Sequence, residues 1–314
     1  MCSHFVTSSQ QERKMPQNNH ADLKAKLRGV LPPIAMPFNE QGELVKGGLK
    51  PQIDFIIDSG ASAIVVGGST GEGHTLSDEE FKQAMTEAYD ANRGRVPFVA
   101  GLIVNSTRQA IARVKLLEGL KLDALQVTPV HYLFKPDADA TVRHFREIYD
   151  ATGIPILIYN VIPWNYLSLE LMSRIMEEVP GVVGMKQSSG DLKAVSDLLL
   201  SCPDKIIVSG VDALLYPGFA LGCQGAISAL TSAVPSVVHK MFTAVEQNDH
   251  RTARDLHFRL AKLWNTLPHD NLPACVKYIQ SLQGVPLFQP RPPMQPVSEA
   301  LKREIKQAFD QLMS

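Results

Sequence analysis

Short apolar runs recur along the chain and are separated by longer, more polar segments. Each run is nearly continuous in apolar residues, many of them β-branched, as expected of parallel strands that are covered on both faces. The runs are 30–38, 63–68, 96–104, 124–130, 155–161, 182–186, 205–211 and 225–230. This pattern predicts eight buried parallel strands.

Several of the intervening segments have the periodicity of amphipathic helices. Residues 77–94 begin with Ser77, followed three positions later by Glu80, which is the pattern of a capping box. Similar segments are 106–120, 137–153 and 168–181. Eight strands alternating with helices favour an α/β fold of the TIM (β/α)8 barrel type. The alternative, a doubly wound open sheet, would need a glycine-rich turn after its first strand, and residues 36–44 do not supply one.

The predicted barrel occupies residues 29–234 and contains the active site. Residues 235–314 are expected to form a C-terminal helical appendage, with helices at 235–247, 250–265, 272–284 and 297–313. Residues 1–28 are polar and lack the apolar centre of a signal peptide, so we expect a disordered extension there.

Charge and cysteine content argue against several classes of function. The 31 Lys and Arg residues are balanced by 32 Asp and Glu residues, so no nucleic-acid partner is expected. No apolar run reaches the ~20 residues of a membrane span, so no membrane partner is expected. Cys2, Cys202, Cys223 and Cys275 are far apart in the sequence, which favours reduced thiols in a cytoplasmic protein. The nine histidines form no metal-binding motif, so no metal site is expected.

The candidate chemistry lies at the carboxyl ends of the predicted strands, where a TIM barrel places its active site. The sequence GGSTGEG, residues 67–73, follows the second strand. Its glycines allow a close approach of the backbone to a ligand, and successive N–H groups in such a turn can bind an anion. With the hydroxyls of Ser69 and Thr70, the loop could hold a small carboxylate. An ordinary strand-to-helix turn has the same composition.

Two other strand ends carry a single polar side chain after an apolar run. Tyr159 could be a core residue with a satisfied hydroxyl, or a proton carrier. The stem of Lys186 could pack on the barrel rim with its amine in water. Alternatively, the amine is kept partly from water so that its neutral form attacks a carbonyl. The apolar run before Lys186 favours the second interpretation.

Three motifs resemble those of one family. GSTGE, YNV and GMKQSSGD occur in the order and spacing of the dihydrodipicolinate synthase / N-acetylneuraminate lyase family of pyruvate-dependent class I aldolases. The resemblance extends over residues 29–310. It implies that Lys186 is the Schiff-base lysine and Tyr159 the proton-shuttling tyrosine. It also implies that Ser69 and Thr70 bind the pyruvate carboxylate and relay protons, and that Gly210 and Ile227 line the pyruvate pocket.

The implied reaction begins when Lys186 attacks the C2 carbonyl of a 2-oxo acid. The imine then accepts electrons from a breaking carbon–carbon bond, or its enamine attacks an aldehyde. Because the imine polarises the substrate, neither a metal nor an organic cofactor is expected. The implied partners are therefore pyruvate and an aldehyde.

The chain departs from the family pattern after YNV. The synthase carries an arginine there, whereas this chain has Trp164 and Asn165, which we expect to line the substrate site. Losing a bidentate carboxylate ligand argues against dicarboxylic chemistry. We therefore expect a Schiff-base lyase that acts on a 2-oxo acid, for which a 2-keto-3-deoxy sugar acid is one candidate. The alternatives are dihydrodipicolinate synthase itself, a dehydratase or hydratase-aldolase that uses the same imine, and a non-catalytic 2-oxo acid sensor.

A second departure lies in TPVHYLFKP, residues 128–136. The family has a tyrosine here that enters the neighbouring subunit's site. In this chain His131 occupies the matching place and Tyr132 follows, so either could take that role. The apolar and aromatic character of the segment predicts an interface. The resemblance implies a homotetramer built as a dimer of dimers.

Overall fold

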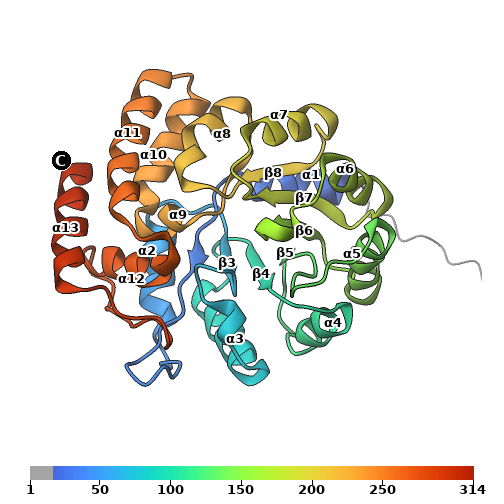
Figure 1. Ribbon diagram of the computed structural model, residues 1–314, viewed down its shortest axis with the longest axis horizontal. Coiled ribbons are helices and arrows are strands. Elements are labelled where there is room, and N and C mark those ends of the chain that lie inside the picture. The colour runs from blue at the N-terminus through green and yellow to red at the C-terminus, as the bar shows by residue number, and fades with distance from the viewer. Residues whose placement is uncertain (1–16) are drawn as a thin grey trace, which may run out of the picture.

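The computed structural model describes residues 17–314 and places its strands in a single parallel sheet (Figure 1). The strands are β1 (Gly29–Val30), β2 (Pro33–Ile34), β3 (Ile64–Val66), β4 (Phe98–Leu102), β5 (Ala124–Val127), β6 (Ile156–Asn160), β7 (Val182–Gln187), β8 (Ile206–Ser209) and β9 (Gly225–Ala226). Every pair of neighbouring strands is parallel.

The sheet closes on itself through its first strand. The order is β1-β9-β8-β7-β6-β5-β4-β3-β2, so β1 and β2 lie at opposite ends, yet only Leu31 and Pro32 separate them in the sequence. The N–H of Leu31 donates to the carbonyl of Ala226 at 2.9 Å, and the N–H of Val65 donates to the carbonyl of Pro32 at 3.0 Å. Proline has no N–H to donate, which explains why one strand is divided into two short pieces. The predicted barrel is confirmed.

Helices cover the outside of the sheet and extend beyond it (Figure 1). Those within the barrel region are α2 (Leu49–Asp58), α3 (Asp78–Asn92), α4 (Thr107–Lys115), α5 (Ala138–Thr152), α6 (Leu169–Glu178), α7 (Leu192–Ser201), α8 (Leu215–Leu221) and α9 (Ala229–Ala233). The C-terminal region forms α10 (Pro235–Glu246), α11 (His250–Thr266), α12 (Leu272–Ser281) and α13 (Glu299–Met313). Short 3-10 turns are η1 (Gly73–Thr75), η2 (Pro163–Asn165), η3 (Asp212–Leu214) and η4 (His269–Asn271). None of the helices in residues 17–314 is both long enough and apolar enough to cross a bilayer.

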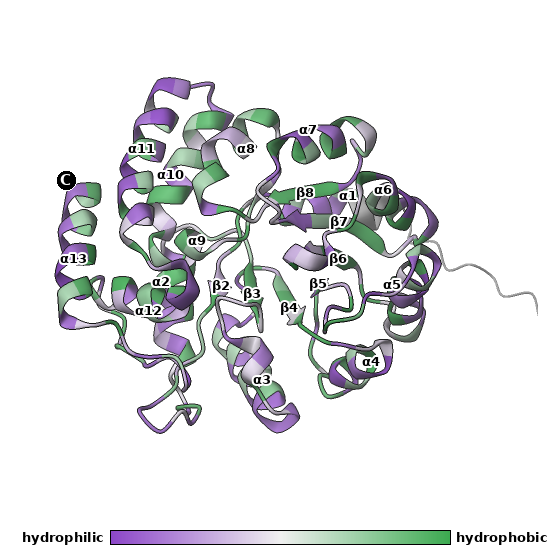
Figure 2. Cartoon of the chain, viewed as in Figure 1, coloured by the Kyte–Doolittle hydropathy of each residue, from purple (hydrophilic) through white to green (hydrophobic). Residues whose placement is uncertain are grey.

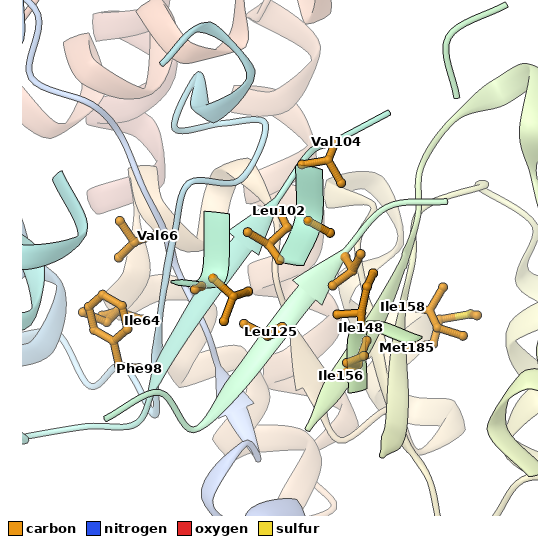
Figure 3. Packing of buried hydrophobic residues seen from close by; sticks show 14 of the residues in the cluster. Ile64, Val66, Phe98, Leu102, Val104, Leu125, Ile148, Ile156, Ile158 and Met185 are labelled. Atoms are coloured by element: carbon orange, nitrogen blue, oxygen red, sulfur yellow. The ribbon is translucent and has the colours of Figure 1, made fainter. Parts of the chain in front are cut away.

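Buried apolar residues form three groups that follow from the barrel geometry. One fills the barrel interior and includes Val65, Val99 and Leu157. Another lies between the strands and their helices, and Figure 3 shows side chains of this group, among them Phe98 and Ile148. The third holds the C-terminal helices against α8 and α9. Figure 2 shows β3, β4 and β8 largely hydrophobic and the surrounding helices mixed, as expected of strands buried on both faces.

Helix α1 (Gln17–Lys26) corrects the expectation of disorder for residues 17–28. Leu23 and Leu27 are buried in the interior group beside Ala63 and Ala124, which stand at the amino ends of their strands. The helix therefore covers one end of the barrel. Its polar sequence hides this role, because among residues 21–28 only these leucines are buried. The rest of the predicted extension, residues 1–16, lies outside the described residues.

The capping residues in the sequence predicted correctly where several helices begin, but the periodicity did not identify every helix. The capping box at α3 is present: Ser77 Oγ accepts from the N–H of Glu80 at 3.2 Å, and Glu80 Oε2 accepts from the N–H of Ser77 at 3.0 Å. Sequence periodicity did not identify α2, α7, α8 or α9.

Candidate active site

Strands β6 and β7 bring Tyr159 and Lys186 side by side at the carboxyl end of the barrel. The two residues are direct partners in the strand register. Each is only 4% exposed, and Lys186 Nζ lies 3.9 Å from the centroid of the Tyr159 ring. The aromatic face therefore shields the amine from water while offering it a favourable electrostatic surface. The predicted partial burial of Lys186 is present.

Tyr159 also joins the glycine-rich loop after β3. Its hydroxyl donates to Ser69 Oγ at 3.2 Å. Ser69 and Thr70 are both half-buried. Residues that lie 90 positions apart in the sequence thus form a chain of hydroxyl groups next to the Lys186 amine. Such a chain can pass a proton between a substrate oxygen and the protein.

The glycine-rich loop, residues 67–73, is folded into a tight turn. The N–H groups of Gly71 and Gly73 both donate to the carbonyl of Gly68, at 3.1 Å each. A Cβ at Gly73 would lie 2.0 Å from the carbonyl oxygen of Gly67, so the turn requires glycine there. Within the described residues, the N–H groups of Ser69 and Thr70 have no backbone acceptor. They are therefore available as donors to an anion, and the carboxylate site proposed from the sequence stays a prediction.

Gly210 and Ile227 lie on the other side of Lys186. A Cβ at Gly210 would come within 2.0 Å of Ser188 Oγ and 3.0 Å of Lys186 Cε. Gly210 therefore makes room for the lysine stem. Ile227 is fully buried in the interior group together with Val208, the β8 partner of Lys186.

Asp212 is a buried acid of the site that the sequence analysis did not select. Its Oδ1 accepts from the N–H of Leu230 at 2.6 Å, and its Oδ2 from the N–H of Ala229 at 3.3 Å. Burial raises the pKa of this carboxyl group, and those two donors, Ser228 and Lys186 oppose the rise. Asp212 is thus a carboxyl group within electrostatic range of the lysine. The signal in the sequence was an acid directly after an apolar strand.

The aromatic loop, residues 131–134, stands at the rim. Tyr132, Leu133 and Phe134 are 68%, 72% and 80% exposed, and His131 is half-buried. In the described chain, His131 Nδ1 lies 3.2 Å from the carbonyl oxygen of Pro129. Neither His131 nor Tyr132 makes a hydrogen bond to Lys186 or Tyr159 within the described residues.

Trp164 and Asn165 hold the base of this loop. Trp164 Nε1 donates to the carbonyl of His131 at 2.7 Å, and Asn165 Nδ2 donates to the carbonyl of Val130 at 2.6 Å. Trp164 is exposed, whereas the Asn165 side chain is buried. Both residues contact the loop in the structure, and the substrate contact expected of them stays a prediction. No guanidinium occupies position 164.

Tyr166, which also stands where the family's arginine would fall, and His74 are further polar groups at the mouth that were not selected as site residues from the sequence. The Tyr166 hydroxyl lies 3.5 Å from the carbonyl of Ser188, and burial, helped by Tyr159, raises its pKa. Burial lowers the pKa of His74, which is within electrostatic range of His131. Among residues 17–314, no group of three or more His, Cys, Asp or Glu side chains is arranged to hold a metal ion.

Comparison with known proteins identifies the family of this chain. A sequence model of the dihydrodipicolinate synthetase family matches residues 26–312. The 4-hydroxy-tetrahydrodipicolinate synthase of Methanopyrus kandleri is 33% identical over 291 residues, covering 89% of this chain and 96% of the relative.

Solved structures show the same fold. N-acetylneuraminate lyase from Mycoplasma synoviae has a TM-score of 0.84 and 27% identity, covering 92% of this chain and 99% of the lyase. A prophage protein of E. coli K12 from the dihydrodipicolinic acid synthase family, solved in complex with pyruvate, has a TM-score of 0.85 and 25% identity, covering 91% and 98%. The resemblance drawn from the motifs is confirmed: the chain belongs to the dihydrodipicolinate synthetase family and is a lyase of the class I aldolase type.

Proposed function

We propose that Lys186 forms an imine with a 2-oxo acid and that the protein cleaves or forms the C3–C4 bond of that acid. The observation that carries the proposal is the arrangement of the Lys186 amine against Tyr159, whose hydroxyl reaches Ser69. A nucleophile and an acid–base group within reach of one substrate are what this chemistry needs. The pyruvate complex of the related E. coli protein supports the choice of ligand.

In the cleavage direction, the Lys186 nitrogen attacks C2 and water leaves, which gives a protonated imine. Tyr159 removes the proton of the C4 hydroxyl group, and Ser69 and Thr70 relay it. As the C3–C4 bond breaks, its electron pair moves into the imine, so an aldehyde and an enamine are formed. The enamine takes up a proton at C3, and water then releases pyruvate and regenerates the amine. Condensation follows the same steps in reverse.

The carboxylate of the 2-oxo acid is assigned to the turn that contains Ser69 and Thr70. Their free N–H groups and hydroxyls are the donors that an anion requires. The imine supplies the polarisation, so we propose no metal and no organic cofactor. Activity that survives exhaustive dialysis against a chelator would support this proposal. Activity that is lost on dialysis and returns when a divalent metal is added would contradict it.

We favour a 2-keto-3-deoxy sugar acid as the substrate. Trp164 is held against the aromatic loop and provides no cationic group for a second carboxylate. The other candidate is 4-hydroxy-tetrahydrodipicolinate synthesis, which is supported by the name of the curated relative. A dehydratase that uses the same imine would retain all the carbons of its substrate, and a sensor would bind pyruvate without turnover.

The decisive test combines trapping with a substrate screen. Pyruvate plus borohydride should leave a stable adduct on Lys186, which peptide mass spectrometry can locate. The purified protein should then release pyruvate from at least one 2-keto-3-deoxy sugar acid. An adduct on a different lysine in active protein would contradict the mechanism, whereas binding without pyruvate release would favour the sensor.

We also propose a homotetramer, built from dimers in which the aromatic loop reaches the neighbouring site. The exposed Tyr132, Leu133 and Phe134 side chains support this, because such patches mark interfaces. The free thiols of Cys202, Cys223 and Cys275 support a cytoplasmic location.

A further inference from the structure

The glycine-rich loop is joined to the C-terminal appendage by a buried ion pair. Lys277, on α12, donates to Glu72 Oε2, although 205 positions separate the two residues. Their side chains are only 2% and 3% exposed. Lys277 Nζ also donates to the carbonyl of Gln289 at 2.7 Å and lies 5.0 Å from the Phe38 ring centroid. Burial lowers the pKa of Lys277, whereas Glu72 raises it.

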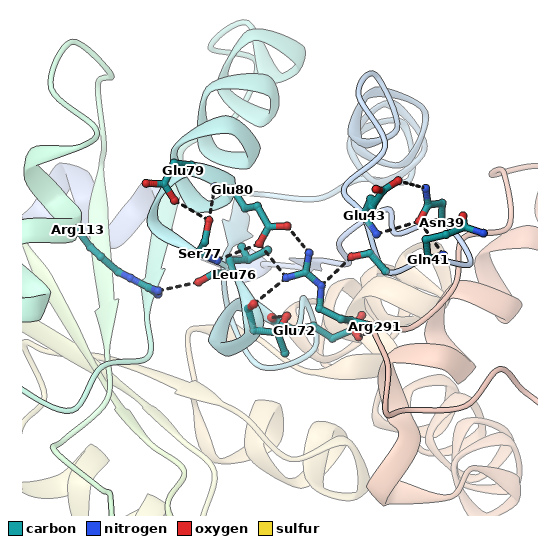
Figure 4. A network of polar contacts seen from close by, with 12 residues as sticks. Asn39, Gln41, Glu43, Glu72, Leu76, Ser77, Glu79, Glu80, Arg113 and Arg291 are labelled. Carbon is teal, nitrogen blue, oxygen red and sulfur yellow. Dashed lines mark hydrogen bonds and ion pairs between the residues drawn. The ribbon is translucent and has the colours of Figure 1, made fainter.

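The second oxygen of Glu72 is also occupied. Glu72 Oε1 accepts from the N–H of Arg291 at 2.7 Å. The guanidinium of Arg291 donates to both carboxylate oxygens of Glu80, at the start of α3, and to the carbonyl of Thr75 at 2.7 Å. Figure 4 shows Arg291 lying between Glu72 and Glu80. The appendage therefore contacts the side chain of Glu72, the end of η1 and the beginning of α3.

The backbone of Glu72 depends on these contacts. Its φ angle is +55°, in the left-handed region that residues other than glycine rarely adopt. In this conformation its N–H donates to the carbonyl of Ser69 at 2.9 Å, which completes the turn that presents the Ser69 and Thr70 N–H groups. An unfavourable conformation persists where surrounding contacts determine it. Here the contacts are those of the Glu72 carboxylate.

We propose that Glu72 and Lys277 are positioning residues, through which the C-terminal appendage holds the Ser69–Thr70 turn in its anion-binding conformation. Neither touches the reacting atoms. This inference rests on the proposed function only in naming the anion as the carboxylate of a 2-oxo acid. It adds a role for α12 that the catalytic motifs do not contain.

The test replaces Lys277 by methionine, which keeps most of the side-chain volume and removes the charge. The matched control is Val276→Ala, because Val276 is a fully buried neighbour on the same helix and packs among the C-terminal helices. Lys277→Met should raise KM for the 2-oxo acid about tenfold and lower kcat to a smaller extent, because the Ser69–Thr70 turn binds the carboxylate and, in the proposed mechanism, also relays protons. Val276→Ala should lower the melting temperature and leave KM unchanged.

Hydrogen exchange gives a readout that does not depend on activity. Amides of residues 69–75 should exchange about tenfold faster in Lys277→Met than in the parent or in Val276→Ala, because local opening becomes easier. If Lys277→Met fails to fold, the double variant Glu72→Gln/Lys277→Met, which leaves no unpaired buried charge, should fold and show the same faster exchange and higher KM.

Unchanged loop exchange together with an unchanged KM in a folded variant would overturn the inference. An equal rise in KM in Val276→Ala would do so as well, because general destabilisation would then explain the effect. If the parent protein forms no adduct with pyruvate, the proposed function fails. In that case the hydrogen exchange of residues 69–75 is the only remaining test of the positioning role.

Discussion

Lys186 Nζ lies 3.9 Å from the centre of the Tyr159 ring, and the hydroxyl of the same tyrosine donates to Ser69. The ring of Tyr159 thus covers the proposed nucleophile, and its hydroxyl contacts the turn to which we assign the substrate carboxylate. The two functions can be separated experimentally.

Tyr159→Phe keeps the ring and removes the hydroxyl. The variant should still form the borohydride adduct with pyruvate, while turnover should fall by about 10²–10⁴-fold, the usual contribution of general acid–base catalysis. Steady-state kinetics alongside mass spectrometry will test this. Tyr166→Phe is the matched control and should retain most activity, since within the part of the chain that the structure describes the Tyr166 hydroxyl has one hydrogen bond, to the carbonyl of Ser188 at 3.5 Å. Near-normal turnover in Tyr159→Phe would remove the hydroxyl from the mechanism.

The group at position 164 should limit dicarboxylic chemistry. With Trp164 in place of a guanidinium, the protein should condense pyruvate with aspartate semialdehyde poorly, far below the ~10 s⁻¹ that is typical of enzymes on their own substrates. A coupled assay measures this rate, and Trp164→Arg should increase it. A parent rate near the typical value would instead favour the synthase.

The aromatic loop should act across a dimer interface. Lys186→Ala and the double variant His131→Ala/Tyr132→Ala should each be inactive. Mixing them with subunit exchange should restore part of the activity, because a hybrid dimer pairs one intact lysine with one intact loop from the other chain. Sedimentation and assay at matched dilution provide the check. A fully active monomer would exclude the shared site.

His144 should make the protein sensitive to acid. It is buried, its Nδ1 lies 2.9 Å from Thr107 Oγ1, and burial lowers its pKa to about 4. Between its ordinary value of 6.5 and about 4, the unfolded chain binds a proton that the folded chain does not. The free energy of unfolding should therefore fall with decreasing pH over this window, by up to ~3 kcal/mol at its lower end.

Urea unfolding at several pH values will test this slope. His144→Gln cannot titrate, so its stability should depend less on pH between 6.5 and 4 than that of the parent. Parallel curves for both proteins would mean that other groups cause the acid sensitivity.

Gln126 should be a site where an apolar substitution stabilises the protein. It is 1% exposed on β5, and neither atom of its amide has a hydrogen-bond partner among the described residues. Gln126→Leu removes the cost of burying these atoms, and the free energy of unfolding should rise by about 1 kcal/mol. Denaturant titration measures the change. A clear loss of stability would show that the amide is hydrogen-bonded in solution.

The sequence by itself determined the barrel and the centre of the site. Continuous apolar runs predicted the strands because burial on both faces excludes polar residues from them. The capping pattern Ser77–Glu80 predicted the start of α3 because both partners lie within one helical turn. Lys186, Tyr159 and Ser69 could be selected because each stands in a short motif at a strand end.

Tertiary structure decided the relationships between residues that are distant in the sequence. The register of β6 and β7 placed Tyr159 beside Lys186, and chain packing brought Lys277 to Glu72 across 205 positions. The sequence did not predict the helix at residues 17–26, because the buried leucines Leu23 and Leu27 pack against residues of strands that follow much later in the chain. Such contacts form only when segments that are far apart in the sequence pack together and become buried. No local sequence pattern encodes this packing. The barrel and its lysine were therefore readable from sequence, whereas the contacts that hold the substrate turn required the folded chain.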